Sequence, residues 1–80
     1  MAAGRAGFSM NYGKAIEKAR LYAKLTQRGL ARAAGFDESY VSMLEKGKRR
    51  PSVWAVQKIA AVTGVDAAKI HAWANQERKG

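Results

Sequence analysis

Helix-capping residues and glycines divide most of the chain into short segments, and the spacing of these helix starts and stops limits the fold more than any other feature. Between these positions apolar residues recur at three- and four-residue steps, the periodicity of an amphipathic helix. No alternating apolar run flanks an Asn-Gly or Asp-Gly turn, so nothing predicts a β-hairpin. The pattern predicts a compact all-α domain of five helices, over residues 12–24, 27–34, 38–46, 53–63 and 67–76.

The residues at the segment boundaries indicate how the helices begin and end. Side-chain oxygens that can accept from a first-turn amide stand at Thr26, Asp37, Ser52 and Asp66. Phe36 is a candidate hydrophobic staple for the third helix. Glycines, which tolerate the left-handed conformation that ends a helix, stand at Gly35, Gly47 and Gly64. The residues expected to face the core are Ile16, Ala19, Ala23, Leu30, Ala31, Ala34, Val41, Leu44, Val53, Val56, Ile59, Ala60, Ile70 and Trp73.

The predicted domain covers residues 11–76 and is flanked by two short segments without helical periodicity. Residues 1–10 are rich in Gly and Ala and are expected to be a flexible arm, and residues 77–80 are expected to be a polar tail. Arg5 in the arm is either filler or a minor-groove contact of the kind that homeodomain arms make. With no internal repeat, the sequence predicts a single domain.

The composition favours an anionic partner. Lys and Arg number 15 against 6 Asp and Glu, so the net charge is +9 on 80 residues, of which 48% are hydrophobic. A basic chain with enough apolar residues for a core is expected to be a folded domain rather than a disordered tail. Nucleic acid is the first expected partner, ahead of an anionic lipid surface or an acidic protein.

The same composition argues against a catalytic or metal centre. The chain has no Cys, and its one His is His71, which we expect at the surface, so we expect no enzyme activity, no metal site and no cofactor. No run of 18 apolar residues and no signal-peptide core is present, so we expect a cytoplasmic protein without a membrane span.

The segment from Gln27 to Glu45 has the layout of a helix-turn-helix, in which the second helix enters the major groove of DNA. On the face of the second helix that is not used for packing lie side chains that can approach base edges: Glu38, Ser39, Ser42, Met43 and Lys46. The tight turn between the helices contains Gly35. These features predict a DNA-binding domain whose reading element is the helix at 38–46.

The stretch LTQRGLARAAGFDESYVSMLEKGKRRPSVWAVQKIAAVTGV resembles the phage-repressor/Cro-type helix-turn-helix domains, also called the xenobiotic-response-element type. The matching landmarks include Leu25-Thr26-Gln27, Gly35, Leu44-Glu45-Lys46-Gly47-Lys48, Pro51-Ser52 and Lys58-Ile59-Ala60. The resemblance covers about residues 12–72 without gaps. It implies a lambda-repressor-like five-helix domain in a prokaryotic or phage regulator that binds double-stranded DNA sequence-specifically, as a repressor.

The resemblance also implies a role for individual residues. Gln27 matches a residue that contacts the DNA backbone. The cations at the end of the reading helix and in the loop after it also match backbone-contacting positions; they are Lys46, Lys48, Arg49 and Arg50. The positions that match base-reading residues are Glu38, Ser39, Ser42 and Met43. Arg20 and Glu45 match a buried salt bridge between the first and third helices.

The sequence departs from the family pattern at positions that matter for base readout. Glu38 and Met43 stand where Gln or Arg is common; Glu favours the cytosine N4 amino group, and Met can contact a thymine methyl. Thr63 stands where a core Leu is usual, which weakens packing unless Trp54 or Trp73 fills the space.

Four further residues carry expectations of their own. Arg28 and Arg32 lie four residues apart on one helix face and are expected to flank the DNA backbone. Tyr40 either packs against the second helix or gives its hydroxyl to a phosphate. Trp54 is expected to face outward, which favours a homodimer through the fourth and fifth helices over simple core packing.

Three other functions remain open at this point. The domain can be an antitoxin or co-regulator that binds a partner protein as well as DNA, with its last helix and tail as the docking segment. It can be a non-specific nucleoid-type protein that uses charge alone. A membrane-surface role is disfavoured, because the fold needs the apolar stripe of the first helix.

Overall fold

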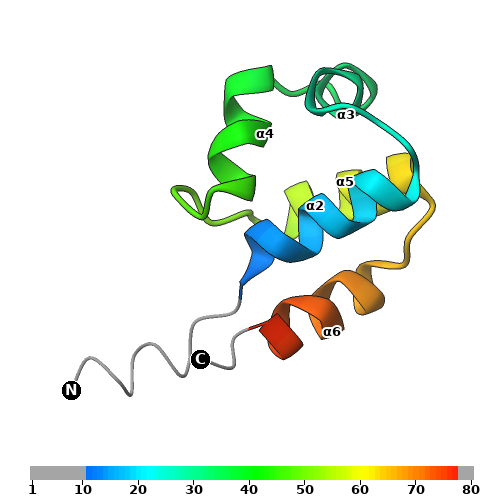
Figure 1. Cartoon of the computed structure of the whole chain (residues 1–80). Helices are drawn as coiled ribbons and strands as arrows, with labels where there is room; N and C mark the ends of the chain where they lie inside the picture. Colours follow the sequence, from blue (N-terminus) through cyan, green and yellow to red (C-terminus); the bar gives the residue numbers. More distant parts are fainter. Residues whose placement is uncertain (1–10, 78–80) are drawn as a thin grey trace.

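The computed structural model describes residues 11–77, which form five α-helices and no strand (Figure 1). With the labels of Figure 1, the helices are α2 (Tyr12–Tyr22), α3 (Gln27–Ala34), α4 (Glu38–Glu45), α5 (Val53–Thr63) and α6 (Ala67–Glu77). In the view of Figure 1, α2 runs through the middle, α3 and α4 lie above it, and α6 lies below it. The predicted all-α class is confirmed; the arm at 1–10 and residues 78–80 of the predicted tail lie outside the described residues.

Side-chain caps begin three of the helices. Thr26 and Ser52 each accept a hydrogen bond from the backbone amide three residues further along, at 2.9 and 3.0 Å, as predicted. Asn11 caps α2 in the same way at 3.0 Å, a cap that we did not predict. Asp37 stands at the N-cap of α4, but its side chain makes no cap hydrogen bond, so the predicted bond is wrong.

The glycines end helices as expected, and a lysine ends one where no glycine is available. Gly35, Gly47 and Gly64 all have φ of 78°, in the left-handed region. Lys24 has φ of 61°, so α2 ends at Tyr22 rather than at the predicted residue 24. The Lys24 and Leu25 amides donate to carbonyls of the last turn of α2, both at 3.0 Å, which is the hydrogen-bond pattern of a Schellman motif.

Two other predicted helix ends are wrong by one residue. α4 ends at Glu45 rather than 46, because Gly47 in the left-handed conformation already turns the chain away and leaves Lys46 as the C-cap. α6 extends to Glu77 rather than 76, so the predicted polar tail begins with a helical residue.

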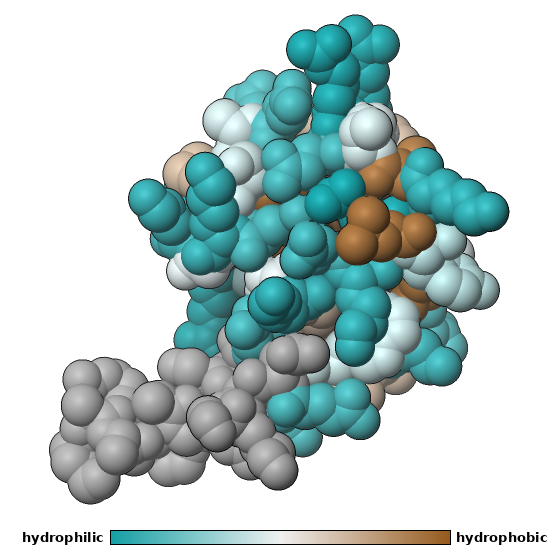
Figure 2. All heavy atoms as spheres, viewed as in Figure 1, coloured by the Kyte–Doolittle hydropathy of each residue, from teal (hydrophilic) through white to brown (hydrophobic). Residues whose placement is uncertain are grey.

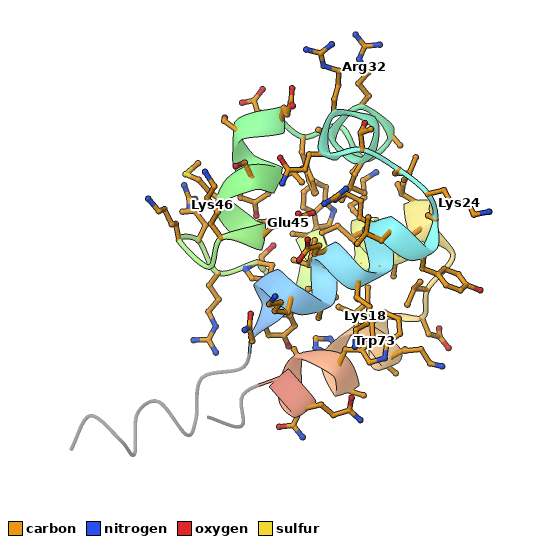
Figure 3. The ribbon with its side chains drawn as sticks, in the orientation of Figure 1. Lys18, Lys24, Arg32, Glu45, Lys46 and Trp73 are labelled. Carbon is orange, nitrogen blue, oxygen red and sulfur yellow. The ribbon has the colours of Figure 1, made fainter. Side chains whose placement is uncertain are left out.

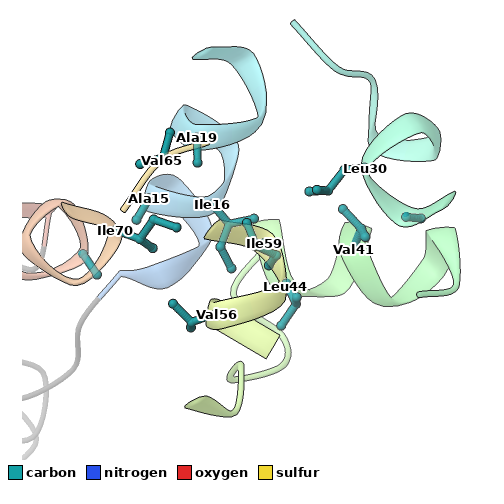
Figure 4. Packing of buried hydrophobic residues seen from close by; sticks show 12 residues of the cluster. Ala15, Ile16, Ala19, Leu30, Val41, Leu44, Val56, Ile59, Val65 and Ile70 are labelled. Carbon is teal, nitrogen blue, oxygen red and sulfur yellow. The ribbon is translucent and has the colours of Figure 1, made fainter. Parts of the chain in front are cut away.

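One apolar core joins all five helices (Figure 4). Its members are Ala15, Ile16, Ala19, Leu30, Ala31, Val41, Leu44, Val56, Ile59, Val65, Ile70 and Ala74. Thr63, where the family has Leu, is buried, and its hydroxyl donates to the Ile59 carbonyl at 2.8 Å. The polar group at this core position is therefore satisfied.

Some residues predicted to face the core lie nearer the surface. Val53 is 68% exposed, because it lies in the first turn of α5, to the side of the face that runs through Val56 and Ile59. Ala23, Ala60 and Trp73 are half-buried rather than core residues.

Contacts at the start of α2 attach α6 to it. The Asn11 amide donates to the Ala74 carbonyl at 3.1 Å, and the Tyr12 hydroxyl is hydrogen-bonded to His71 Nδ1. Further along, Lys18 Nζ lies 5.2 Å from the centre of the Trp73 ring (Figure 3). His71 is therefore half-buried and joins two helices, instead of being the ordinary surface histidine that we expected.

Hydrophilic side chains cover most of the face shown in Figure 2, with small apolar patches between them, one of them near the end of α2. Among residues 11–77, no helix is both long and apolar enough to cross a membrane. In the same part of the chain, no three His, Cys, Asp or Glu side chains gather where they could hold a metal ion.

Candidate nucleic-acid interface

The candidate interface is built on α3 and α4, which the left-handed Gly35 joins. The two helices pack through their buried sides, which include Leu30 of α3 and Val41 of α4 (Figure 4). The Phe36 ring in the turn meets the Tyr40 ring edge-on at 5.1 Å, which packs the turn against the first residues of α4. This packing fixes how α4 presents its opposite side to solvent.

The four predicted base-reading residues all lie on the uncovered side of α4. Glu38 and Ser39 are exposed, and Ser42 and Met43 are half-buried one turn later. Glu38 is not isolated, because its Oε1 lies 3.4 Å from Arg28 Nε of α3. The residues therefore offer hydroxyl, thioether and carboxylate groups along one accessible strip.

Exposed cations lie at the end of this strip, in the turn after α4. They are Lys46, Lys48, Arg49 and Arg50 (Figure 3, where Lys46 is labelled). The Lys48 and Arg49 amides donate to the Met43 carbonyl at 2.9 and 3.3 Å, so the backbone of this turn is tied to α4. The Arg49 guanidinium lies 5.7 Å from the centre of the Tyr40 ring.

Arg32 of α3 is a further exposed cation, on the other side of the strip from the loop after α4. In Figure 3 it extends outward from α3, away from the other helices. Sequence spacing grouped it with Arg28, and both extend from α3, but Arg28 Nε lies 3.4 Å from Glu38 Oε1 of α4. Cations of α3 and of the loop after α4 thus border the strip on two sides.

The Arg20–Glu45 pair implied by the resemblance joins α2 to the last turn of α4 (Figure 3, where Glu45 is labelled). Arg20 donates from Nε and Nη2 to the two Glu45 oxygens at 2.7 and 3.0 Å, and from Nη1 to the Leu25 carbonyl at 3.0 Å. The hydrogen bond to Glu45 raises the pKa of Arg20 above its ordinary value, although burial acts against this. Both side chains are largely buried, at 12% and 6% exposed.

Gln27 and Tyr40 were predicted to contact the DNA backbone, and both have partners inside the protein. The Gln27 carboxamide donates to Glu45 Oε1 at 3.0 Å, which adds α3 to the Arg20–Glu45 pair. The Tyr40 ring packs against Phe36, which lies in the turn after α3 rather than in the predicted second helix. Phosphate contacts from the Gln27 amide and the Tyr40 hydroxyl stay predictions.

Gly13 is a structural residue of the site that sequence analysis missed. It lies in the first turn of α2, where a Cβ would come within 2.4 Å of the Glu45 carbonyl oxygen and 2.9 Å of the Leu44 one. Only a residue without a side chain lets α2 approach the end of α4 so closely. The available signal was a glycine inside a helical pattern with no turn to make.

Trp54 lies beside the interface and is 60% exposed, as its outward position predicted. Its ring meets Phe36 at 5.8 Å, and Lys58 Nζ lies 5.9 Å from its centre. The edge of Trp54 therefore extends the Phe36–Tyr40 aromatic contact onto the surface of α5.

Comparisons with known proteins agree with this geometry. The Helix-turn-helix family matches residues 16–70. An uncharacterised HTH-type transcriptional regulator, YqaF of Bacillus subtilis (strain 168), is 40% identical over 53 residues, which span 66% of this chain and 70% of that protein. The crystal structure of the restriction-modification controller protein C.AhdI from Aeromonas hydrophila superposes with a TM-score of 0.71 at 28% identity, covering 76% of this chain and 92% of that one. The chain therefore belongs to the helix-turn-helix family of the xenobiotic-response-element type, a family of DNA-binding transcription regulators.

Proposed function

We propose that the protein is a sequence-specific repressor that inserts α4 into the major groove of double-stranded DNA. The observation that carries the proposal is the uncovered strip of α4, with base-reading groups on it and exposed cations on both sides. Phosphate contacts from the cations would set the register, and the α4 side chains would read base edges. Repression would follow from occupation of operator DNA, since all the described helices form the DNA-binding domain itself.

In-vitro selection on random duplex DNA, with binding measured over a range of salt concentrations, tests this function. We expect a preferred, palindromic sequence. With about six phosphate contacts per protomer, the affinity should fall about a thousandfold for each bound protomer between 50 and 200 mM salt, and by about the square of that factor for a bound dimer. Strong binding without any sequence preference would support the nucleoid-type alternative instead, and salt-independent binding would contradict the backbone contacts.

We further propose that the protein binds DNA as a homodimer through α5. Trp54 lies at one end of the outward side of this helix, and a shallow, open hollow lined by Ala61, Gly64 and Asp66 lies at the other. Ala61 follows Trp54 by seven residues, or about 10 Å along a helix. In an antiparallel, two-fold arrangement, Trp54 of each copy would therefore reach the hollow of the other.

The charge of α5 suits pairing with a second copy. Lys58 is the only charged residue of this helix, and its Nζ already lies near the ring of Trp54. Two copies of a chain of net charge +9 would repel each other across most other faces. In the dimer, two α4 helices would meet half-sites about 34 Å apart, one turn of DNA.

Sedimentation of wild type and of Trp54→Glu and Ala61→Glu tests the α5 dimer. Each substitution would put a charge into the pairing surface, so we expect a concentration-dependent dimer for wild type and monomers for both variants. Leu21→Glu is the matched control, because Leu21 is an exposed apolar residue (57%) on a different helix, α2. A Trp54→Glu variant that dimerises like wild type would refute this interface.

A further inference from the structure

Arg28 and Arg32 occupy the same face of α3 by sequence spacing, yet the structure gives them different surroundings. Arg28 Nε lies 3.4 Å from Glu38 Oε1, so the first turn of α3 is joined to the first turn of α4. Arg32 forms no ion pair with any residue between 11 and 77. The side chains of Arg28 and Glu38 are 70% and 51% exposed, so their pair lies at the surface that would meet DNA.

A carboxylate in the first turn of a helix that enters a DNA groove needs a nearby cation. Glu38 would enter a groove bordered by two rows of phosphates, and an unpaired carboxylate is repelled there. In the free protein an exposed pair like Arg28–Glu38 contributes little. When the groove excludes water, the attraction between the two groups strengthens, because the surrounding dielectric falls.

We propose that Arg28 is a specificity-determining residue that acts through Glu38, rather than a phosphate contact. Its guanidinium holds the Glu38 carboxylate at the base edges, where the carboxylate accepts a hydrogen bond from the N4 amino group of a cytosine. Arg28 positions the reading group and compensates its charge, and Arg32 keeps the ordinary role of a backbone contact. This inference rests on the proposed function.

The consequence is that Arg28 and Glu38 control discrimination at the same base pair. Replacing Glu38 by Gln removes the carboxylate that selects cytosine. Replacing Arg28 by Gln leaves the carboxylate without its cation, so the carboxylate turns away from the phosphates and the same selection is lost. A phosphate contact acts differently, because its loss weakens binding to every sequence by about the same factor.

The test measures how Arg28→Gln, Glu38→Gln, the double variant and the matched control Arg32→Gln bind the selected operator and all its single-base-pair variants. Circular dichroism checks that each protein is folded, which we expect because all three side chains are exposed. For wild type we expect about tenfold or greater discrimination at one C·G pair. Arg28→Gln and Glu38→Gln should both reduce it to below about threefold at that pair alone, and the double variant should lose no more than either single variant.

Arg32→Gln should weaken binding to all duplexes equally and keep the discrimination. If Arg28→Gln behaves like Arg32→Gln on an operator that wild type clearly prefers, the inference is overturned while the proposed function stands. If wild type prefers no sequence, both are overturned.

Discussion

Removing the buried Glu45 carboxylate is expected to destabilise the domain more than removing that of Glu38, the other charged residue of α4. Three hydrogen bonds end on this carboxylate, two from Arg20 at 2.7 and 3.0 Å and one from Gln27 at 3.0 Å. In Glu45→Ala the Arg20 guanidinium, only 12% exposed, would keep its charge without an anionic partner. Breaking a buried pair in this way costs about 3–5 kcal/mol.

That cost is large for a chain of 80 residues, because a domain of this length is stable by only about 4–12 kcal/mol. Urea unfolding followed by far-ultraviolet circular dichroism measures the loss as a lower midpoint. Glu17→Ala is the control, because Glu17 acts on Arg20 only through space and its loss should cost less than about 1 kcal/mol. A loss below about 1 kcal/mol for Glu45→Ala would refute the reasoning.

A double variant separates the pair from the packing around it. Arg20→Met with Glu45→Leu removes both charges and leaves apolar groups of similar length, so it should be more stable than Glu45→Ala alone. Strict additivity of the two single losses would mean that the groups do not act on each other.

Three further predictions, on one helix contact and two helix ends, can be tested by thermal unfolding. Gly13→Ala should lower Tm, because the steric cost of about 1–3 kcal/mol against the Glu45 and Leu44 carbonyls exceeds the gain in helix propensity. Gly29→Ala should lower it less or not at all, because its Cβ would meet only side-chain atoms, the nearest being Thr26 Oγ1 at 3.2 Å. Lys24→Gly should stabilise by up to about 1 kcal/mol, because Lys24 has φ of 61°, and an unchanged or lower Tm would contradict this. Thr26→Ala should cost about 1 kcal/mol and Asp37→Ala much less, because only Thr26 makes a cap bond; equal losses would count against the assignment.

Local sequence rules predicted the helices and most of their ends, because caps and glycine stops depend on a few neighbouring residues. The helix stops at Gly35, Gly47 and Gly64 were predicted correctly for this reason. The end of α2 was wrong because Lys24 takes a conformation that is unfavourable by itself, and the packing and hydrogen bonds around Leu25 impose it. Such an ending has no local signature.

The candidate site was predicted as a set of residues but not as a set of contacts. The α4 residues share one surface because helical periodicity determines which of them face outward. The Arg28–Glu38 pair, the Gln27–Glu45 hydrogen bond and the close approach at Gly13 each join residues of different helices. Spacing along the chain holds no information about such distances. The resemblance implied the Arg20–Glu45 pair, and the only sequence signal for the others was the glycine inside a helical pattern at Gly13.

The contact of Gly13 with the end of α4 has a consequence for engineering new DNA specificities. α2 lies outside the helix-turn-helix motif, yet it meets the last residues of α4 at Gly13 and again through Arg20. A grafted α4 would keep its angle to the rest of the domain only in a host that offers both residues at these places. Portability of the motif therefore depends on a glycine and an arginine seven positions apart in the preceding helix.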